Sequence, residues 1–172
     1  MAINWTTLDT AIKAWLDGQV PTLTWYRAQQ DVPAQPVPFG VWDWTSRGRK
    51  SPTQGELPDD RHMVDEDERQ VLHHRRHTLQ INAFSASTVG NTDAVAYLET
   101  VRDSLELEAV RVALDAAGMV LVPIGGVRDI TALLPDRGES RAVLEITVYT
   151  VDSVTEDVGS IQTAEITPTL VT

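Results

Sequence analysis

The segment RAVLEITVYT, residues 141–150, decides the fold of this chain. Its apolar residues recur at every second position, and Glu145, Thr147 and Tyr149 occupy positions between them. The apolar row consists of Ala142, Leu144, Ile146 and Val148. Such alternation, which continues to Val154, predicts a strand with one buried face and one face that is exposed to solvent or contacts a partner. A strand of this kind needs neighbouring strands and a layer over its apolar face.

Similar patterns predict the other elements. Apolar residues spaced by three and four predict a helix over residues 5–17 that stops at Gly18. Strands are expected over residues 23–28, 39–46, 70–85 and 119–124, and two helices over 92–105 and 108–117, the second closed by Gly118. A short mixed segment at 127–133 and a strand candidate at 160–167 follow. Gly125-Gly126 matches no phosphate-binding pattern, so we expect a turn there.

The order of these elements predicts an α+β fold, a mostly antiparallel sheet with helices packed on one face. One hydrophobic core is expected, and therefore a single domain over residues 1–172. Residues 47–68 are almost all polar, so they are expected to form a projecting loop or a long hairpin tip that becomes ordered against a partner. Residues 155–172 are expected to form a C-terminal extension.

Composition excludes several classes of function. The chain has 172 residues, 42% of them hydrophobic, which is enough for one core. It contains no cysteine, which excludes disulfides and thiolate chemistry. Its net charge of −11 opposes nonspecific attraction to DNA or to anionic membranes. There is no secretory signal and no apolar run of about 20 residues, so we expect a soluble protein with no membrane partner.

The run HHRRH, residues 73–77, is the most unusual local motif. On a straight strand His73 and His77 share a face but lie roughly 13 Å apart at about 3.3 Å per residue, and His74 points away. They cannot chelate one metal ion by themselves. No nucleophile elbow or paired catalytic carboxylates are found elsewhere, so we predict no metal, no cofactor and no catalytic residue.

The basic groups of this run favour a protein partner. They could contact phosphates, but four carboxylates at 65–68 precede them in an acidic chain. We therefore predict that Arg75 and Arg76 pair with carboxylates of a neighbouring copy or partner protein. Trp42 and Trp44 share one strand face, where core packing is favoured over a protein–protein hot spot. The candidate interface residues are Trp42, Trp44, Arg49, His73, Arg75, Arg76, His77 and Arg141.

Motifs spread along most of the chain carry a resemblance. They are the opening helix, Trp25 with Gln29-Gln30, PVPF at 36–39, LQINAF at 79–84, AGM at 117–119, VRDITALL at 127–134, ESRA at 139–142 and DVGSI at 157–161. In this order they resemble the small neck or tail-terminator proteins of tailed bacteriophages. The HHRRH run and the Trp42-Asp43-Trp44 triplet depart from what a typical member is expected to have.

The resemblance implies a structural virion protein and not an enzyme. Proteins like this form a ring, usually of six copies, that ends the tail tube and joins it to the head connector. DNA would pass through the lumen without specific binding. The expected location is the neck of the virion, after assembly in the host cytoplasm.

Three alternatives stay open. A head-completion or stopper ring of the same neck has similar length and composition. A small intracellular metal-dependent hydrolase requires distant residues to converge on His73 or His77. A nucleic-acid-binding module requires the basic strand to lie on an exposed concave face.

Overall fold

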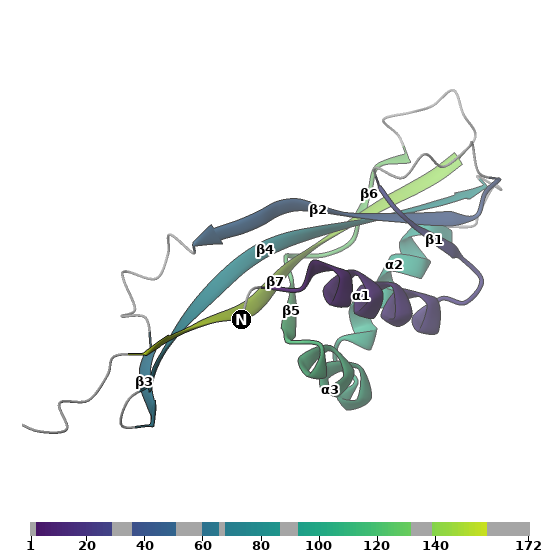
Figure 1. Cartoon of the computed structure of the whole chain (residues 1–172). Coiled ribbons are helices and arrows are strands. Elements are labelled where there is room, and N and C mark those ends of the chain that lie inside the picture. The colour runs from purple at the N-terminus through teal and green to yellow at the C-terminus, as the bar shows by residue number, and fades with distance from the viewer. Residues whose placement is uncertain are drawn as a thin grey trace, which may run out of the picture.

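The computed structural model describes residues 3–28, 36–50, 60–65, 68–86, 93–131 and 139–157. Within these ranges the chain forms three helices and seven strands (Figure 1). In order they are α1 (Trp5–Gln19), β1 (Thr24–Arg27), β2 (Phe39–Lys50), β3 (Asp60–Asp65), β4 (Glu68–Ala86), α2 (Asp93–Ser104), α3 (Glu108–Ala116), β5 (Met119–Pro123), β6 (Arg128–Asp129) and β7 (Glu139–Asp157).

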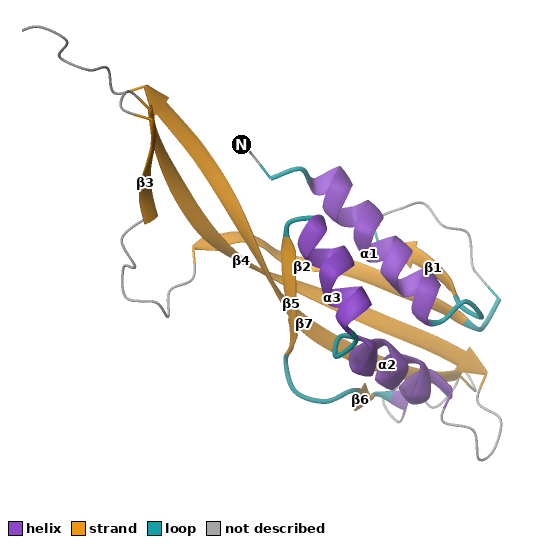
Figure 2. Cartoon of the chain, turned by 90° about the horizontal axis from the view of Figure 1, so that it is seen from below, coloured by secondary structure: helices purple, strands orange, loops and turns teal. Residues whose placement is uncertain are grey.

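All seven strands belong to one sheet. The main order is β1-β2-β4-β7-β5, while β3 pairs with β4 and β6 pairs with β7. The β1–β2 pair is parallel and every other pair is antiparallel. The three helices cover one face of this sheet, as the view from below shows (Figure 2). The predicted α+β fold with helices on one face is therefore confirmed.

Strand β7 is an interior strand of the sheet, between β4 and β5, and one of its faces is buried as its alternation predicts. The four residues of its apolar row are all 0% exposed. Across the sheet this row continues into β4, where Ile146 lies opposite Leu79 and Leu144 lies opposite Ile81. Helix α2 packs over both strands. The inward face of the longest antiparallel pair thus forms the core beneath the helices.

Helix α1 is tied to its surroundings at several points. Asn4 caps its first turn by accepting a hydrogen bond from the backbone N–H of Thr7 at 3.3 Å. The indole N–H of Trp15 donates to the Ser104 hydroxyl on α2 at 2.9 Å. Asp9 joins α1 to the sheet, because it accepts from the Trp44 indole at 2.8 Å and forms an ion pair with Arg27. The helix continues one residue past Gly18, because the last turn is held by packing and not ended at the glycine.

The α3–β5 connection matches its predicted chemistry. Gly118 follows the end of α3 with φ +81°, the left-handed conformation that glycine adopts without a Cβ penalty. At the turn expected at Gly125-Gly126 the chain bends, and Gly125, two residues after the end of β5, has φ +75°. Gly118 therefore turns the chain from α3 into β5, whereas Gly125 lies at a bend between β5 and β6, which both run antiparallel to β7.

Strands β4 and β7 form a ribbon longer than the rest of the domain. They are paired residue by residue from Glu68 opposite Asp157 to Ala86 opposite Glu139. One end of the ribbon, together with β3, extends well beyond the helices (Figure 1). This agrees with the idea that the first half of the strand around residues 70–85 extends beyond the packed domain.

Parts of the polar segment 47–68 are strands, which differs from the expected projecting loop but not from the alternative of a long hairpin. Residues 47–50 belong to β2, and residues 60–65 form β3, which pairs with the start of β4. The sequence did not predict β3, because few residues of this segment are apolar. Backbone hydrogen bonds do not require apolar side chains, so the segment can form a strand where the edge of another strand is available. Residues 51–59, 66–67 and 158–172, including the strand candidate at 160–167, lie outside the described residues.

Candidate subunit interface

Three of the predicted interface residues lie in the interior of the chain. Trp42 and Trp44 are 2% and 5% exposed, so of the two interpretations core packing is the one the structure shows. His77 is 0% exposed and lies edge-on to Trp5, with ring centroids 5.1 Å apart. We expected His77 on a solvated or interface-lining strand. That placement is wrong, because the helix-facing side of β4 is buried at His77 as well as at Leu79 and Ile81.

Buried His77 forms a hydrogen bond of 2.9 Å between Nε2 and the hydroxyl of Thr150 on β7. We predict that His77→Phe lowers the free energy of unfolding by about 1–3 kcal/mol, because the ring contacts persist while a buried hydroxyl loses its partner. A urea unfolding midpoint measures the effect. The double variant His77→Phe/Thr150→Val removes both partners and should recover part of the loss; an unchanged midpoint for the single variant contradicts the prediction.

The two arginines of the basic run point to opposite sides of the sheet. Odd-numbered residues of β4, such as Leu79, face the helices, so Arg75 lies on that side and Arg76 on the other. Both are partly buried. In the β2–β4 register Arg49 lies opposite Arg76. The side chains of Arg49 and His73 lie outside the described part of the structure.

Arg141 ends a row of aromatic residues on the helix-free face. Its guanidinium carbon lies 4.6 Å from the ring centroid of Phe84, which stacks on Phe39 at 4.5 Å. Tyr26 meets Phe39 edge-on at 6.5 Å. The row therefore crosses four strands from β1 to β7, and the arginine caps it by a cation–π contact. Arg141 is thus partly buried against the sheet.

Sequence reasoning missed an apolar strip at the β5 edge. Val120 lies opposite Tyr149, and both are on the face without helices. The exposed members of the strip are Val120, Val122, Ile124, Tyr149 and Val151, with exposures of 42–52%. The signal was present, because residues 119–124 are apolar at every position and therefore on both faces. The strip therefore leaves five large apolar side chains exposed to water.

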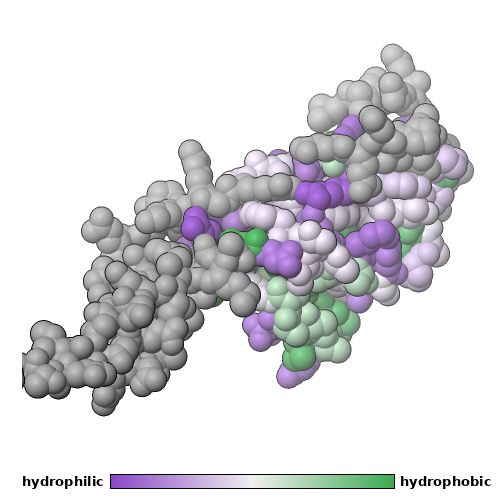
Figure 3. All heavy atoms as spheres, viewed as in Figure 1, coloured by the Kyte–Doolittle hydropathy of each residue, from purple (hydrophilic) through white to green (hydrophobic). Residues whose placement is uncertain are grey.

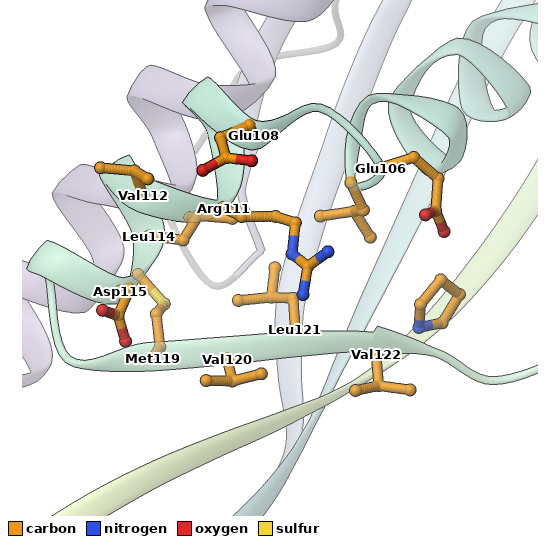
Figure 4. Close-up of a pocket in the computed structure, with 12 residues that line it drawn as sticks. Glu106, Glu108, Arg111, Val112, Leu114, Asp115, Met119, Val120, Leu121 and Val122 are labelled. Atoms are coloured by element: carbon orange, nitrogen blue, oxygen red, sulfur yellow. The ribbon is translucent and has the colours of Figure 1, made fainter.

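An open groove of about 650 Å³ lies between α3 and β5. Figure 3 shows apolar residues gathered over this part of the molecule. The charged residues that line it are Glu106, Glu108, Arg111 and Asp115. In the close-up, Arg111 extends from α3 into the space above β5 (Figure 4). The groove thus combines an apolar lining with a rim that carries more negative than positive charge.

The described residues contain no group of three or more His, Asp or Glu side chains placed to hold a metal ion. In the same part of the chain, no helix is both long and apolar enough to cross a membrane.

A sheet covered on one face, a ribbon reaching past the domain and an uncovered apolar strip are features of a structural subunit that contacts other proteins. The family follows from sequence comparison, in which residues 6–170 match the phage neck terminator protein family. The chain belongs to this family. As a member of this family it is a structural phage protein.

Two solved structures were compared with the fold. The sheath/tube terminator of an extracellular contractile injection system, in its extended state, matches with a TM-score of 0.61 and 14% identity. The match covers 98% of this chain, which spans 63% of that chain, and it shows a shared fold. A second structure matches at a TM-score of 0.40 and 12% identity over 88% of this chain and 97% of that one. A search of curated proteins found no match.

Proposed function

We propose that copies of this chain close into a ring, expected from the resemblance to hold six, which ends the tail tube and joins it to the head connector. The apolar strip formed by β5 and β7 carries this proposal, because a single subunit leaves it exposed to water. The family and the terminator fold support a position at the end of the tube. Assembly would take place in the host cytoplasm.

A head-to-tail contact suits such a ring. A heterologous interface joins two different surfaces and closes when the rotation between copies is right. In the described part of the chain the sheet has two different edges, β1 with the later part of β2 at one side and β5 at the other. The ribbon of β4 and β7 provides further surface beyond the helices for a neighbouring copy or an adjoining ring.

The acidic balance of the chain suits a channel for DNA. The net charge is −11, and carboxylates facing the lumen would repel phosphates. Screening limits this repulsion to charges within about 8 Å, so the residues that line the channel set the effect. DNA would then pass without specific binding.

Two measurements test the proposal. Immunogold labelling of virions that carry a tagged copy should place the signal at the junction of head and tail. Light scattering after size exclusion, with and without purified tail tubes, should show a closed oligomer. Label at another part of the virion, or a subunit that stays monomeric in both conditions, contradicts the proposed ring.

We predict that Arg75→Ala/Arg76→Ala weakens assembly with little change in subunit stability. Exposed or partly exposed ion pairs contribute only about 0–1 kcal/mol each to folding, whereas a partner that depends on them loses contacts. Oligomer mass and the urea midpoint are compared with those of the unchanged chain. Normal assembly combined with a salt-dependent loss of duplex DNA binding would show that the partner is nucleic acid.

A further inference from the structure

We propose that β5 of one copy accepts segment 160–167 of a neighbouring copy as an added strand. The open edge of β5 and the groove between β5 and α3 would together form the binding site. This inference rests on the proposed ring, and it names a contact that would hold neighbouring copies together.

Strand β5 presents an open backbone edge. In the described part of the chain it pairs only with β7. The backbone N–H of Ile124, just past the strand, donates to the Glu145 carbonyl on β7 at 2.8 Å. Backbone groups of alternate residues face the same neighbour in an antiparallel pair, so those of Val120 and Val122 also face β7. The N–H and C=O groups of Leu121 therefore point away from β7, toward the open edge.

This edge lacks the features that usually prevent strand addition. Edge strands are commonly protected by charged side chains, by proline or by bulges. The sequence of β5, MVLVP, contains no charged residue, and its one proline, Pro123, is the last residue of the strand. The register of β5 on β7 runs without a shift. An extended segment of another chain can therefore pair with β5 and continue the sheet.

Apolar surface lies on both sides of the β5 edge. On the face without helices, Val120 and Val122 are 52% and 46% exposed. On the other face Leu121 points toward α3, where Val112 of the groove lining is 60% exposed (Figure 4). The groove of about 650 Å³ leaves room for side chains there. Because the side chains of an added strand alternate between the two faces, both of its rows would cover apolar surface.

Segment 160–167, SIQTAEIT, has a sequence that fits this site. It is rich in isoleucine and threonine, which favour strands, and Pro168 follows it directly. Its even-numbered residues are uncharged, whereas Glu165 shares the odd-numbered row with Ile161. The groove is lined by three carboxylates and one arginine, so it would repel an acidic residue. The uncharged row would therefore enter the groove, and Ile161 would lie on the face of the exposed valines.

Chain length favours a neighbouring copy over the same copy as the source of the segment. Met119, the first residue of β5, lies opposite Thr150, and β7 continues from there to Asp157. Residues 151–157 span roughly 23 Å at about 3.3 Å per residue. Residues 158–160 can return at most about 11 Å. The segment therefore cannot lie along β5 of its own copy, and the ribbon ends well beyond the helices, where another copy can be reached (Figure 1).

The first experiment separates the edge from the segment. Leu121→Pro removes the outward N–H without removing a bond to β7, and Ile161→Asp/Ile166→Asp places a charge on each row of the segment. Each variant alone should lose self-association by about tenfold or more, as measured by light scattering. Each contact needs one edge and one segment, so an equimolar mixture should form a two-subunit complex and no ring. Leu121→Ala keeps the N–H and should still form the ring.

Far-UV circular dichroism and the urea midpoint show whether each variant is folded. If Leu121→Pro fails to fold, Val112→Glu takes its place as the edge variant. Val112 is 60% exposed, so this change leaves the core intact. Assembly should still be lost, because a carboxylate in the groove is costly to bury beneath an added strand.

The second experiment uses the absence of cysteine from the chain. Val122→Cys and Ile161→Cys chains are mixed and treated with a short bis-maleimide, both in solution and on assembled tails. Because each chain has one cysteine, any link joins two copies, and a dimer of the two different chains should form. A mixture of Ile161→Cys with Glu99→Cys, an exposed position on α2, should give none.

The outcomes separate this contact from the ring. If the unchanged chain forms no oligomer in solution or on tails, the proposed ring is wrong and the contact falls with it. If it forms a ring while a folded edge variant also assembles, or while Val122→Cys and Ile161→Cys give no mixed dimer, the contact is overturned and the ring stands. Normal assembly of the Ile161→Asp/Ile166→Asp chain would overturn the choice of segment 160–167 as the added strand.

Discussion

Ile146→Ala is expected to lower the free energy of unfolding by about 2–5 kcal/mol, the range measured for large-to-small changes in close-packed cores. Ile146 is 0% exposed and lies between Leu79 on β4 and Pro123 on β5. Removing its methyl groups leaves a cavity that the central strand cannot collapse, because neighbours on both sides hold the register. Leu144→Ala, one step along the same buried row, should cost a similar amount.

The same strand supplies a matched control. Val148 is 0% exposed and Val151 is 52% exposed, so one substitution to alanine is made inside the core and an identical one outside it. Val148→Ala should lower the urea midpoint clearly, while Val151→Ala should stay within about 0.5 kcal/mol, as most surface changes do. Measurements at low protein concentration keep assembly from adding to stability. Equal effects at the two positions would mean that the alternation does not report burial.

Gly40→Ala is expected to destabilise the protein by about 3 kcal/mol or more, at or above the upper end of the usual cost of overpacking. A Cβ at Gly40 would lie 2.2 Å from two ring carbons of Trp25, on the neighbouring strand β1. Trp25 is 1% exposed and therefore has no free space into which to turn. The indole lies directly over the glycine, and either β1 or the ring must move.

Gly18→Ala is the control for this substitution. Gly18 lies inside α1, and nothing is within 4 Å of the Cβ that alanine would add. Alanine is favoured over glycine in a helix by about 0.5–1 kcal/mol, so this variant should be slightly more stable. Replacing Trp25 with leucine should partly rescue Gly40→Ala by making room. A thermal or urea midpoint for Gly40→Ala equal to that of the unchanged chain would rule out the close contact.

Much of the fold could be predicted because its signals are periodic and local. The inward row of β7, the two adjacent helices and the turn at Gly118 each depend on residues a few positions apart. Alternation reports one buried face of a strand wherever helices or another layer cover it. The predicted ends of helices and strands were less accurate. Helix α1 passes Gly18 by one residue, because burial of Trp15 and Leu16 against the core outweighs the weak preference of glycine for a helix end.

The types of residue in the candidate site could be predicted from the sequence, but their arrangement in space could not. The basic character of β4 is plain in the sequence, but the burial of His77 depends on Trp5 and Thr150, which lie 72 and 73 positions away. The apolar strip needed the register of β5 on β7 to place Val120 beside Tyr149. Strand β3 needed the free edge of β4 as its partner, since its own composition is polar.

Local periodicity was therefore enough to specify which segments are helices and strands, which face of β7 is buried, and the α+β class. Pairing between distant segments decided the rest. The burial of His77 and the space between α3 and β5 are properties of residues that the fold brings together. Such contacts join residues that are far apart in the sequence, so no short-range pattern predicts them. Only folding of the whole chain creates the surfaces on which a terminator subunit acts.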